Sequence, residues 1–252
     1  MTRTVAVIPA HDEEDAVGSV VERARRHVDL VLIIDDGSHD RTAERARAAG
    51  AEVISLNPNR GKGGALRVGL AAAVERGAEV VVTLDADGEH NPDELTLLLA
   101  ATADADVVLG ARKVYRSGMR RALNALALFW FQVLDPSIRD TICGYRAFRV
   151  AALPKLATEA GGFAYEQEVI LLAVAAGLRL KTVDIVTVPR AGSHVKGSDV
   201  LRANNHFDRW VLAHLGSLRL GVWRKALLAA GCVAGLLLGA PAEWALDRKR
   251  AA

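Results

Sequence analysis

The chain of 252 residues is 51% apolar and 25% charged, with a formal net charge of +2. These values exclude a globally disordered protein and fit one large domain, or one domain with an appendage. Cys143 and Cys232 lie far apart, which excludes a disulfide framework and the usual metal or redox spacings. The first ten residues hold no long apolar run, so we expect no secretory signal.

The first 110 residues alternate between apolar, β-branched runs and helix-like segments. The runs predict strands over residues 4–9, 30–35, 51–56, 79–84 and 106–111. The segments between them predict helices over 13–27, 40–49, 62–76 and 92–103, with Asp40 as an N-cap and Pro92 in a first turn. Apolar strands separated by amphipathic helices predict an α/β fold with a doubly wound, mostly parallel sheet.

The pattern changes after residue 111. We expect an apolar helix over 119–134, a strand or loop over 141–149, a helix over 165–176, a strand over 178–188 and an amphipathic helix over 200–215. Residues 226–242 carry no charge and would form a helix about 26 Å long, against a hydrocarbon core of about 30 Å. With basic residues on both sides, this tail favours a marginal membrane span or an in-plane membrane helix over a soluble packing helix.

Charge is unevenly distributed along the chain. Residues 112–121 hold five Lys or Arg and no acid, and residues 186–225 hold seven against two acids. Acids instead follow three predicted strands, in PAHDEE (9–14), DDGS (35–38) and DADG (85–88). Ligands of open parallel sheets bind beyond the carboxyl ends of the strands, so these segments predict an acidic site that faces basic segments.

Asp85 and Asp87 are close enough in the turn after their strand to point into one crevice. Two neighbouring carboxylates raise each other's pKa unless a cation neutralises them. Hard ions such as Mg²⁺ and Mn²⁺ bind carboxylates together with substrate phosphate oxygens. An isolated pair of this kind is more often a solvated turn, but beside two more acidic strand ends it predicts a divalent-metal site.

Residues 59–64, NRGKGG, open the third predicted helix without P-loop spacing, and no G-x-G-x-x-G follows the first strand. A helix N-terminus with Lys62 suits an anion, and a tight strand-to-helix turn is the plainer alternative. We expect His11 to contact a nucleobase or polar group rather than a metal, because no second histidine lies nearby. His90 is expected to be an exposed residue ahead of the next helix.

Five motifs, VIPAHDEE, IIDDGSHDRT, NRGKGGAL, LDADGEHNP and CGYRAF, occur in this order over residues 4–200. Together they resemble the family 2 glycosyltransferases and, within them, the polyprenyl-phosphate (dolichol-phosphate) mannosyl- and glucosyltransferases. The resemblance implies a GT-A type nucleotide-sugar-binding domain, inverting hexose transfer and bound Mg²⁺ or Mn²⁺. The implied donor is GDP-mannose or UDP-glucose, and the implied acceptor is a polyprenyl phosphate.

Carried over position by position, the resemblance implies roles for individual residues. The implied donor-binding residues are Pro9, Ala10, His11, Glu13, Asp36, Lys62, Asp85, Ala86, Asp87, Arg112, Arg190 and Lys196. The implied metal ligands are Asp85, Asp87 and Glu89. Arg120 or Arg121 would meet the acceptor phosphate, and the implied catalytic set is Asp87, Arg112, Arg121 and Glu168.

Two mechanisms remain open at this point. A phosphomonoester carries about −1.5 to −2 charges near neutral pH, so it is already a nucleophile and needs no general base. A soluble family 2 glycosyltransferase with a hydroxyl acceptor would need a carboxylate base, for which Glu168 and Asp140 are candidates. Glu166 and Glu168 lie where other family 2 enzymes carry a catalytic carboxylate, and a solvated helix face is their alternative. A nucleotidyltransferase or an inactive binding scaffold fits the motifs less well.

We therefore expect a catalytic domain over residues 1–198, followed by an amphipathic helix and an apolar, membrane-associated tail over 199–252. The expected partners are a nucleotide sugar, a polyprenyl phosphate and a membrane surface, with no nucleic acid. The expected location is the cytoplasmic face of a membrane, held peripherally or by a single marginal C-terminal span.

Overall fold

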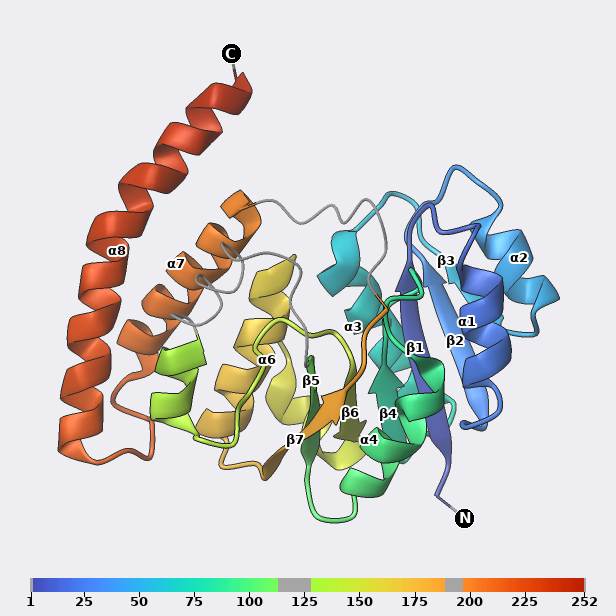
Figure 1. The fold of residues 1–252 in the computed structure, drawn as a ribbon, viewed down its shortest axis with the longest axis horizontal. Coiled ribbons are helices and arrows are strands. Elements are labelled where there is room, and N and C mark those ends of the chain that lie inside the picture. The colour runs from blue at the N-terminus through green and yellow to red at the C-terminus, as the bar shows by residue number, and fades with distance from the viewer. Residues whose placement is uncertain (1, 113–127, 189–196, 252) are drawn as a thin grey trace.

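A sheet of seven strands runs through the middle of the computed structural model, which describes residues 2–112, 128–188 and 197–251 (Figure 1). The strands are β1 (Thr4–Ala10), β2 (Leu30–Asp35), β3 (Glu52–Ser55), β4 (Val80–Thr83), β5 (Val107–Arg112), β6 (Arg146–Arg149) and β7 (Leu180–Ile185). The helices are α1 (Val17–Ala24), α2 (Thr42–Ala48), α3 (Gly61–Glu75), α4 (Leu95–Ala101), α6 (Phe163–Ala175), α7 (Gly197–His214) and α8 (Val222–Ala251). Two short 3₁₀ helices, η1 (Pro92–Glu94) and η2 (Val150–Leu156), complete the described elements.

The sheet is mostly parallel, as predicted. Its strand order is β3-β2-β1-β4-β6-β5-β7. β6 alone among the described strands runs antiparallel, paired with β4 on one side and β5 on the other. β1 lies between β2 and β4, so the chain winds outward on one side of β1 and then crosses to the other. The carboxyl ends of β1 and β4 therefore border the kind of crevice in which open α/β sheets bind ligands.

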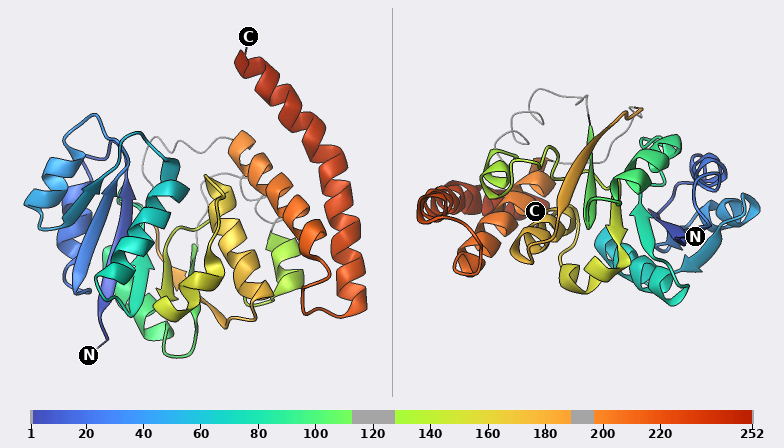
Figure 2. Two further views of the ribbon diagram at one scale, coloured as in Figure 1. Left: turned by 180° about the vertical axis from the view of Figure 1, so that it is seen from behind. Right: turned by 90° about the horizontal axis from the view of Figure 1, so that it is seen from below.

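Both faces of the sheet are buried under helices, as Figure 2 shows. Alternate side chains of β1 divide between two cores: Val5 and Val7 join the core under α3, α6, α7 and α8. Ala6 and Ile8 join the core under α1, α2 and α4. Successive residues of a strand point to opposite faces, so burial on both sides explains why the predicted strands are almost continuously apolar.

The last two helices lie side by side at the end of the molecule farthest from β3 (Figures 1 and 2). A Cβ atom at Gly231 of α8 would meet the ring of Trp130, and one at Gly235 would meet the carboxylate of Asp208 on α7. Phe207 and Leu228, one from each helix, belong to the same apolar core as β1 and α6. The domain boundary at residue 198 stays a prediction. Described residues on both sides of it belong to this one core.

The C-terminal helix is longer than predicted and runs unbroken over Val222–Ala251. Across the described residues, no helix combines the length and apolar character that crossing a bilayer requires, so the marginal span is not confirmed. Leu228 faces the core, whereas Trp223, Leu227 and Val233 are exposed. The described part of α8 therefore has one buried side and one apolar side that faces outward.

Asp208 is a buried acid between α7 and α8, and its pKa is raised to about 6 because burial disfavours its charged form. The folded pKa lies above the unfolded one, so this group lowers the free energy of unfolding as pH rises from about 4 to about 6. The asparagine does not titrate, so the free energy of unfolding of Asp208→Asn relative to the wild type should be about 2 kcal/mol higher at pH 8 than at pH 4.5. Urea unfolding of both proteins at the two pH values measures this difference, and an equal difference at both would contradict it.

Candidate functional site

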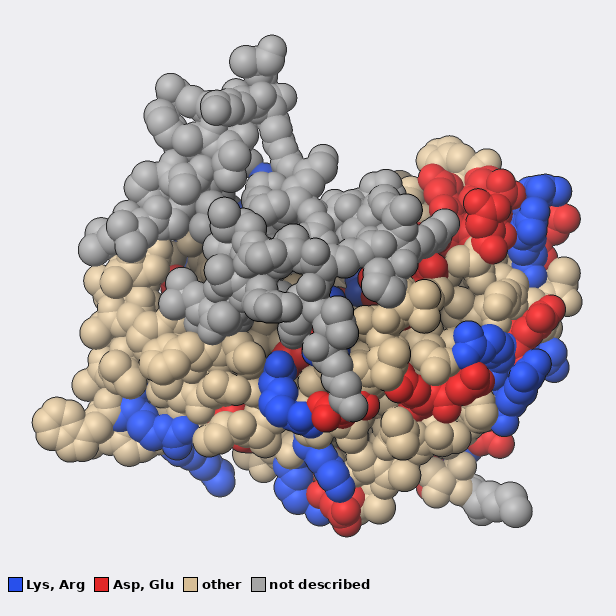
Figure 3. All heavy atoms as spheres, viewed as in Figure 1, with Lys and Arg blue, Asp and Glu red and all other residues tan. Residues whose placement is uncertain are grey.

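The loops after β1 and β2 are fastened to each other at the sheet edge. Ala10 and Asp35 are register partners at the ends of these strands. Beyond them, the Asp12 N–H donates to Ser38 Oγ at 3.0 Å, and the His39 N–H donates to Asp12 Oδ1 at 2.7 Å. Figure 3 shows acidic side chains gathered over these loops. The structure thus brings two of the predicted acidic segments to one rim, beside the β1–β4 crevice.

Glu13 and Asp36 are positioned by the same network. The Glu13 N–H donates to Thr42 Oγ1 at 2.7 Å, and the Asp36 carboxylate accepts the Arg60 N–H at 2.7 Å. The buried Asp36 side chain therefore ties the β2 loop to the residues that open α3. This places the predicted nucleoside-side residues, which come from separate motifs, around one rim.

His11 lies close to a second histidine, contrary to the reasoning from sequence. The ring centroids of His11 and His39 are 6.1 Å apart, and Asn59 Nδ2 lies 3.3 Å from His11 Nδ1. Asn59 Nδ2 also donates to the Asp36 carbonyl at 2.8 Å. These two histidines are far apart in the sequence but meet because β1 and β2 are neighbouring parallel strands.

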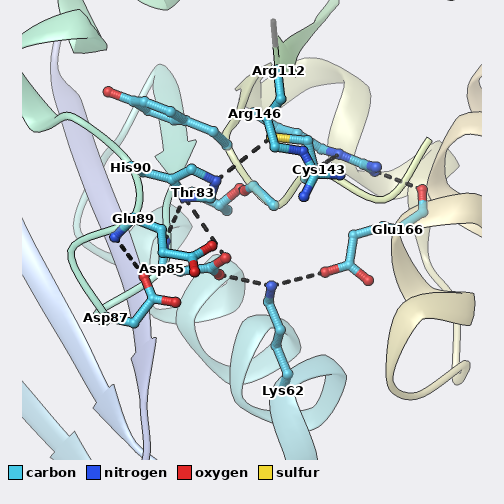
Figure 4. A network of polar contacts seen from close by, with 12 residues as sticks. Lys62, Thr83, Asp85, Asp87, Glu89, His90, Arg112, Cys143, Arg146 and Glu166 are labelled. Carbon is cyan, nitrogen blue, oxygen red and sulfur yellow. Dashed lines mark hydrogen bonds and ion pairs between the residues drawn. The ribbon is translucent and has the colours of Figure 1, made fainter. Parts of the chain in front are cut away.

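The acidic loop after β4 carries Asp85, Asp87 and Glu89, which Figure 4 shows clustered near Lys62. Burial and the nearby charges of Asp85 and Glu89 together raise the pKa of Asp87 to about 6. Burial alone would raise the pKa of Asp85 too, but the Lys62 ammonium group holds it down at about 2. The Asp87 carboxylate also accepts the Glu89 N–H at 2.9 Å, which fixes the turn.

The chemistry of this loop fits the implied metal. Its potential ligands are carboxylate oxygens, the hard donors that Mg²⁺ and Mn²⁺ prefer. The pKa of Asp87 is raised by its burial and by the neighbouring acids, and a divalent cation bound here would favour the charged form of this carboxylate. Asp85, Asp87 and Glu89 are therefore the residues that could hold the ion.

Lys62, at the start of α3, lies between two carboxylates. Its Nζ is 2.7 Å from Asp85 Oδ1 and 3.1 Å from Glu166 Oε1 (Figure 4). Burial would lower the pKa of Lys62, but the two carboxylates raise it, so the side chain stays charged. The ammonium group contacts the acidic loop through Asp85. The role of Lys62 in binding the donor stays a prediction.

His90 is buried, so the prediction of an exposed residue was wrong. Its ring lies 5.1 Å from that of Tyr145, and burial lowers its pKa to about 4. The neutral ring accepts the Asp85 N–H at Nδ1 (3.2 Å), which leaves Nε2 facing Cys143 Sγ at 3.6 Å. The histidine therefore holds the backbone of the acidic loop through the Asp85 N–H.

Arg112 ends β5 in a bidentate pair with Asp140. Its Nε and Nη2 donate to the two carboxylate oxygens at 2.8 and 3.1 Å. The Asp140 carboxylate also accepts the N–H groups of Ile142 and Cys143, both at 3.1 Å. Asp140 is buried, so it acts as a clamp that orients Arg112 and shapes the turn that enters CGYRAF.

The buried Arg146 explains the rest of the CGYRAF motif. Its guanidinium group donates to the carbonyls of Cys143 (2.9 Å), Glu166 (2.6 Å) and Thr141 (3.2 Å). It therefore joins the turn beside Arg112 to the start of α6. The sequence signal for this buried arginine is weak, because β6 carries arginines at both ends and only Arg146 is buried.

Glu168 is not brought into this cluster. It lies two residues beyond Glu166 on α6 and meets His206 Nε2 of α7 at 2.5 Å. The predicted residues Arg121, Arg190 and Lys196 lie outside the described residues. The structure thus brings the predicted nucleoside and metal residues together with Arg112 and with two of the candidate carboxylates, Asp140 and Glu166. It adds His90, Cys143 and Arg146 around them.

The fold is that of the GT-A glycosyltransferases. Glucosyl-3-phosphoglycerate synthase from Mycobacterium tuberculosis, solved with uridine diphosphate, matches with a TM-score of 0.69 at 22% identity, over 84% of this chain and 79% of that one. The same enzyme solved with Mn²⁺, uridine diphosphate and glucosyl-3-phosphoglycerate matches with a TM-score of 0.66 at 23% identity, over the same shares. At such identities the similarity shows the fold alone.

The sequence comparisons identify the family. The model of glycosyl transferase family 2 matches residues 5–157, and the chain belongs to that family of enzymes. An undecaprenyl-phosphate mannosyltransferase from Micrococcus luteus is 32% identical, over 84% of this chain and 95% of that protein. A polyprenol monophosphomannose synthase from Mycolicibacterium smegmatis is 29% identical, over 82% and 86%. A UDP-N-acetylglucosamine–dolichyl-phosphate N-acetylglucosaminyltransferase from Methanococcus voltae is 28% identical, over 84% and 96%.

Proposed function

We propose that this glycosyltransferase moves a hexose, with inversion, from GDP-mannose or UDP-glucose to a polyprenyl phosphate in a metal-dependent reaction. The names of three relatives that align over most of both chains support a polyprenyl-phosphate acceptor. The loops after β1 and β2 and the acidic loop after β4 lie along one rim of the sheet, and their motifs support a nucleotide-sugar donor.

The observation that carries this proposal is how the candidate bases are engaged. The Asp140 carboxylate accepts hydrogen bonds from Arg112 and from two backbone N–H groups. Glu168 is paired with His206, and Glu166 with Lys62. A hydroxyl acceptor needs a base to take its proton, whereas a phosphate acceptor is already ionised. The arrangement of these three carboxylates therefore favours a phosphate nucleophile.

The remaining residues have electrostatic and positional roles in this mechanism. Pro9, Ala10, His11, Glu13 and Asp36 line the rim that receives the nucleoside. Asp85, Asp87 and Glu89 would hold Mg²⁺ or Mn²⁺, with Ala86 buried between the two aspartates. The bound ion would supply positive charge for the leaving nucleoside diphosphate. Arg112 is oriented toward the same task by Asp140, and Arg121, Arg190 and Lys196 stay predicted phosphate contacts.

Replacing Glu168 by Gln tests the acceptor. We expect transfer to a short polyprenyl phosphate to stay within about threefold of wild type, since Gln still meets His206 and no base is required. Glu159→Gln, at an exposed position, controls for the loss of one negative charge. A loss of about 10²-fold in kcat for Glu168→Gln alone would contradict the phosphate mechanism and favour a hydroxyl acceptor.

A lipid acceptor also requires a membrane surface, for which α8 is the proposed contact. Trp223 and Leu227, four residues apart on one side of α8, are 88% and 48% exposed, and Val233 further along is 48% exposed. Arg224 and Lys225 lie beside them and can approach anionic headgroups. An apolar helix side with flanking basic residues is typical of helices that lie in the plane of a membrane. We propose peripheral attachment at the cytoplasmic face.

The double variant Trp223→Ser/Leu227→Ser tests this surface. Both side chains are exposed, so the fold should be unchanged, while sedimentation with anionic phospholipid vesicles should fall about tenfold or more. Val74→Ser, at an exposed valine of α3, is the matched control and should sediment like wild type. Equal sedimentation of the double variant and the control would exclude α8 as the contact.

A further inference from the structure

Three charged side chains from different elements form a row at the acidic loop. Lys62 Nζ lies 2.7 Å from Asp85 and 3.1 Å from Glu166, so one ammonium group serves two carboxylates (Figure 4). Asp85 is partly exposed at the rim, with 29% of its side chain accessible, whereas Glu166 is 1% exposed. The lysine therefore links an acid of the site to an acid of the interior.

Glu166 depends on this lysine. Among the described residues, neither of its carboxylate oxygens accepts a hydrogen bond, and Oε1 forms an ion pair with Lys62 Nζ at 3.1 Å. The buried Arg146 guanidinium group also attracts this carboxylate, but its hydrogen bonds go to backbone carbonyls. A buried carboxylate without a cationic partner is strongly unfavourable. Glu166 therefore keeps the ammonium group within reach, whatever happens at Asp85.

The backbone of Gly144 covers the row and leaves it little room. A Cβ atom at this position would lie 2.8 Å from Lys62 Nζ and 3.0 Å from Asp85 Oδ1. The glycine lets the main chain pass directly over the ion pair. The ammonium group is thus confined between two carboxylates, and a shift away from one keeps it beside the other.

We infer that Lys62 is a built-in counter-ion of the metal site, which holds Asp85 in the metal-free protein and withdraws to Glu166 when a divalent cation binds. The inference rests on the proposed function in taking Asp85 as a metal ligand. Both cations would compete for the same carboxylate and would repel each other across a few ångströms. Lys62 and Glu166 are then positioning residues that set the affinity of the site for metal, with opposite signs.

Mn²⁺ binding to the full chain, without donor or acceptor, tests this inference by titration calorimetry. Lys62→Met removes the competing charge, so Mn²⁺ should bind about tenfold tighter than in wild type. Glu166→Gln removes the anion that receives the lysine, so Mn²⁺ should bind about tenfold weaker. The double variant loses both charges, which guards against misfolding from one unpaired buried charge, and its affinity should lie between those of the two single variants.

Lys155→Met is the matched control, since it removes one exposed lysine at a distance and should leave Mn²⁺ affinity unchanged. If Lys62 and Glu166 only supported the fold, both single variants should change the Mn²⁺ affinity in the same direction. Weaker or unchanged Mn²⁺ binding in Lys62→Met would overturn the inference. So would the absence of Mn²⁺ binding to the wild type. Sugar transfer is not measured, so failure of the proposed acceptor or donor would leave these results intact.

Discussion

Asp87→Asn should lower kcat by about 10³-fold and leave the fold intact. Asn at this position can still accept the Glu89 N–H that fixes the turn, so the change removes charge and little else. With one carboxylate fewer, the loop would hold the divalent ion poorly and leave the charge of the departing diphosphate uncompensated. Steady-state kinetics over a range of Mn²⁺ concentrations, with circular dichroism for the fold, measures the effect.

Asp93→Asn is the control for this variant. Asp93 is an exposed acid six residues further along, where it pairs with Arg23 and His27, and its loss should leave kcat within about twofold.

The wild type should also need more Mn²⁺ at pH 5 than at pH 7.5. The pKa of Asp87 is raised to about 6, so protons compete with the metal below that pH. Normal turnover of Asp87→Asn would remove the acidic loop from the mechanism.

Asp140→Ala should lower the free energy of unfolding by about 3 kcal/mol and also abolish most activity. The substitution leaves the Arg112 guanidinium group without its bidentate partner, and it strips the N–H groups of Ile142 and Cys143 of their acceptor. The arginine then loses its orientation beside the acidic loop. Urea unfolding gives the stability, and kcat of the remaining folded protein gives the effect on transfer.

Asp104→Ala is the matched control for the stability loss, because it breaks an ion pair with Lys181 in which both side chains are largely exposed. An exposed pair contributes little, so this change should cost less than about 1 kcal/mol. Asp140→Asn should fall between the two, since it keeps one acceptor oxygen. A cost for Asp140→Ala no larger than for Asp104→Ala would mean that the clamp does not stabilise the fold.

The sheet could be predicted from sequence because each central strand is buried on both faces. Val31 to Ile34 of β2, for example, are all buried, and such runs stand out between helical segments. The direction of β6 could not be predicted in this way, since a short run such as Arg146–Arg149 is compatible with either direction. α1 begins later than predicted, at Val17, because hydrogen bonds of the Glu13 and Glu14 N–H groups hold the preceding acids in a turn.

Site residues that belong to short sequence motifs could be predicted, whereas those defined by contacts between distant segments were missed. Asp85 and Asp87 could be predicted because two acids closely follow an apolar strand. His90 was predicted to be exposed because it directly precedes the next helix, whereas the fold buries it against Tyr145 and Cys143. The pairing of Glu166 with Lys62 joins residues 104 positions apart, a contact that no local pattern encodes.

Transfer of a labelled hexose to a short polyprenyl phosphate tests the central claim most directly. GDP-mannose, UDP-glucose and related nucleotide sugars should be supplied in turn, with and without Mn²⁺, and the phosphate-free polyprenol should serve as the matched acceptor. We expect one donor to yield a polyprenyl-phosphate hexose with inverted configuration, only when Mn²⁺ or Mg²⁺ is present, and no product from the alcohol. Absence of product from every donor, or equal transfer to the alcohol, would contradict the proposed reaction.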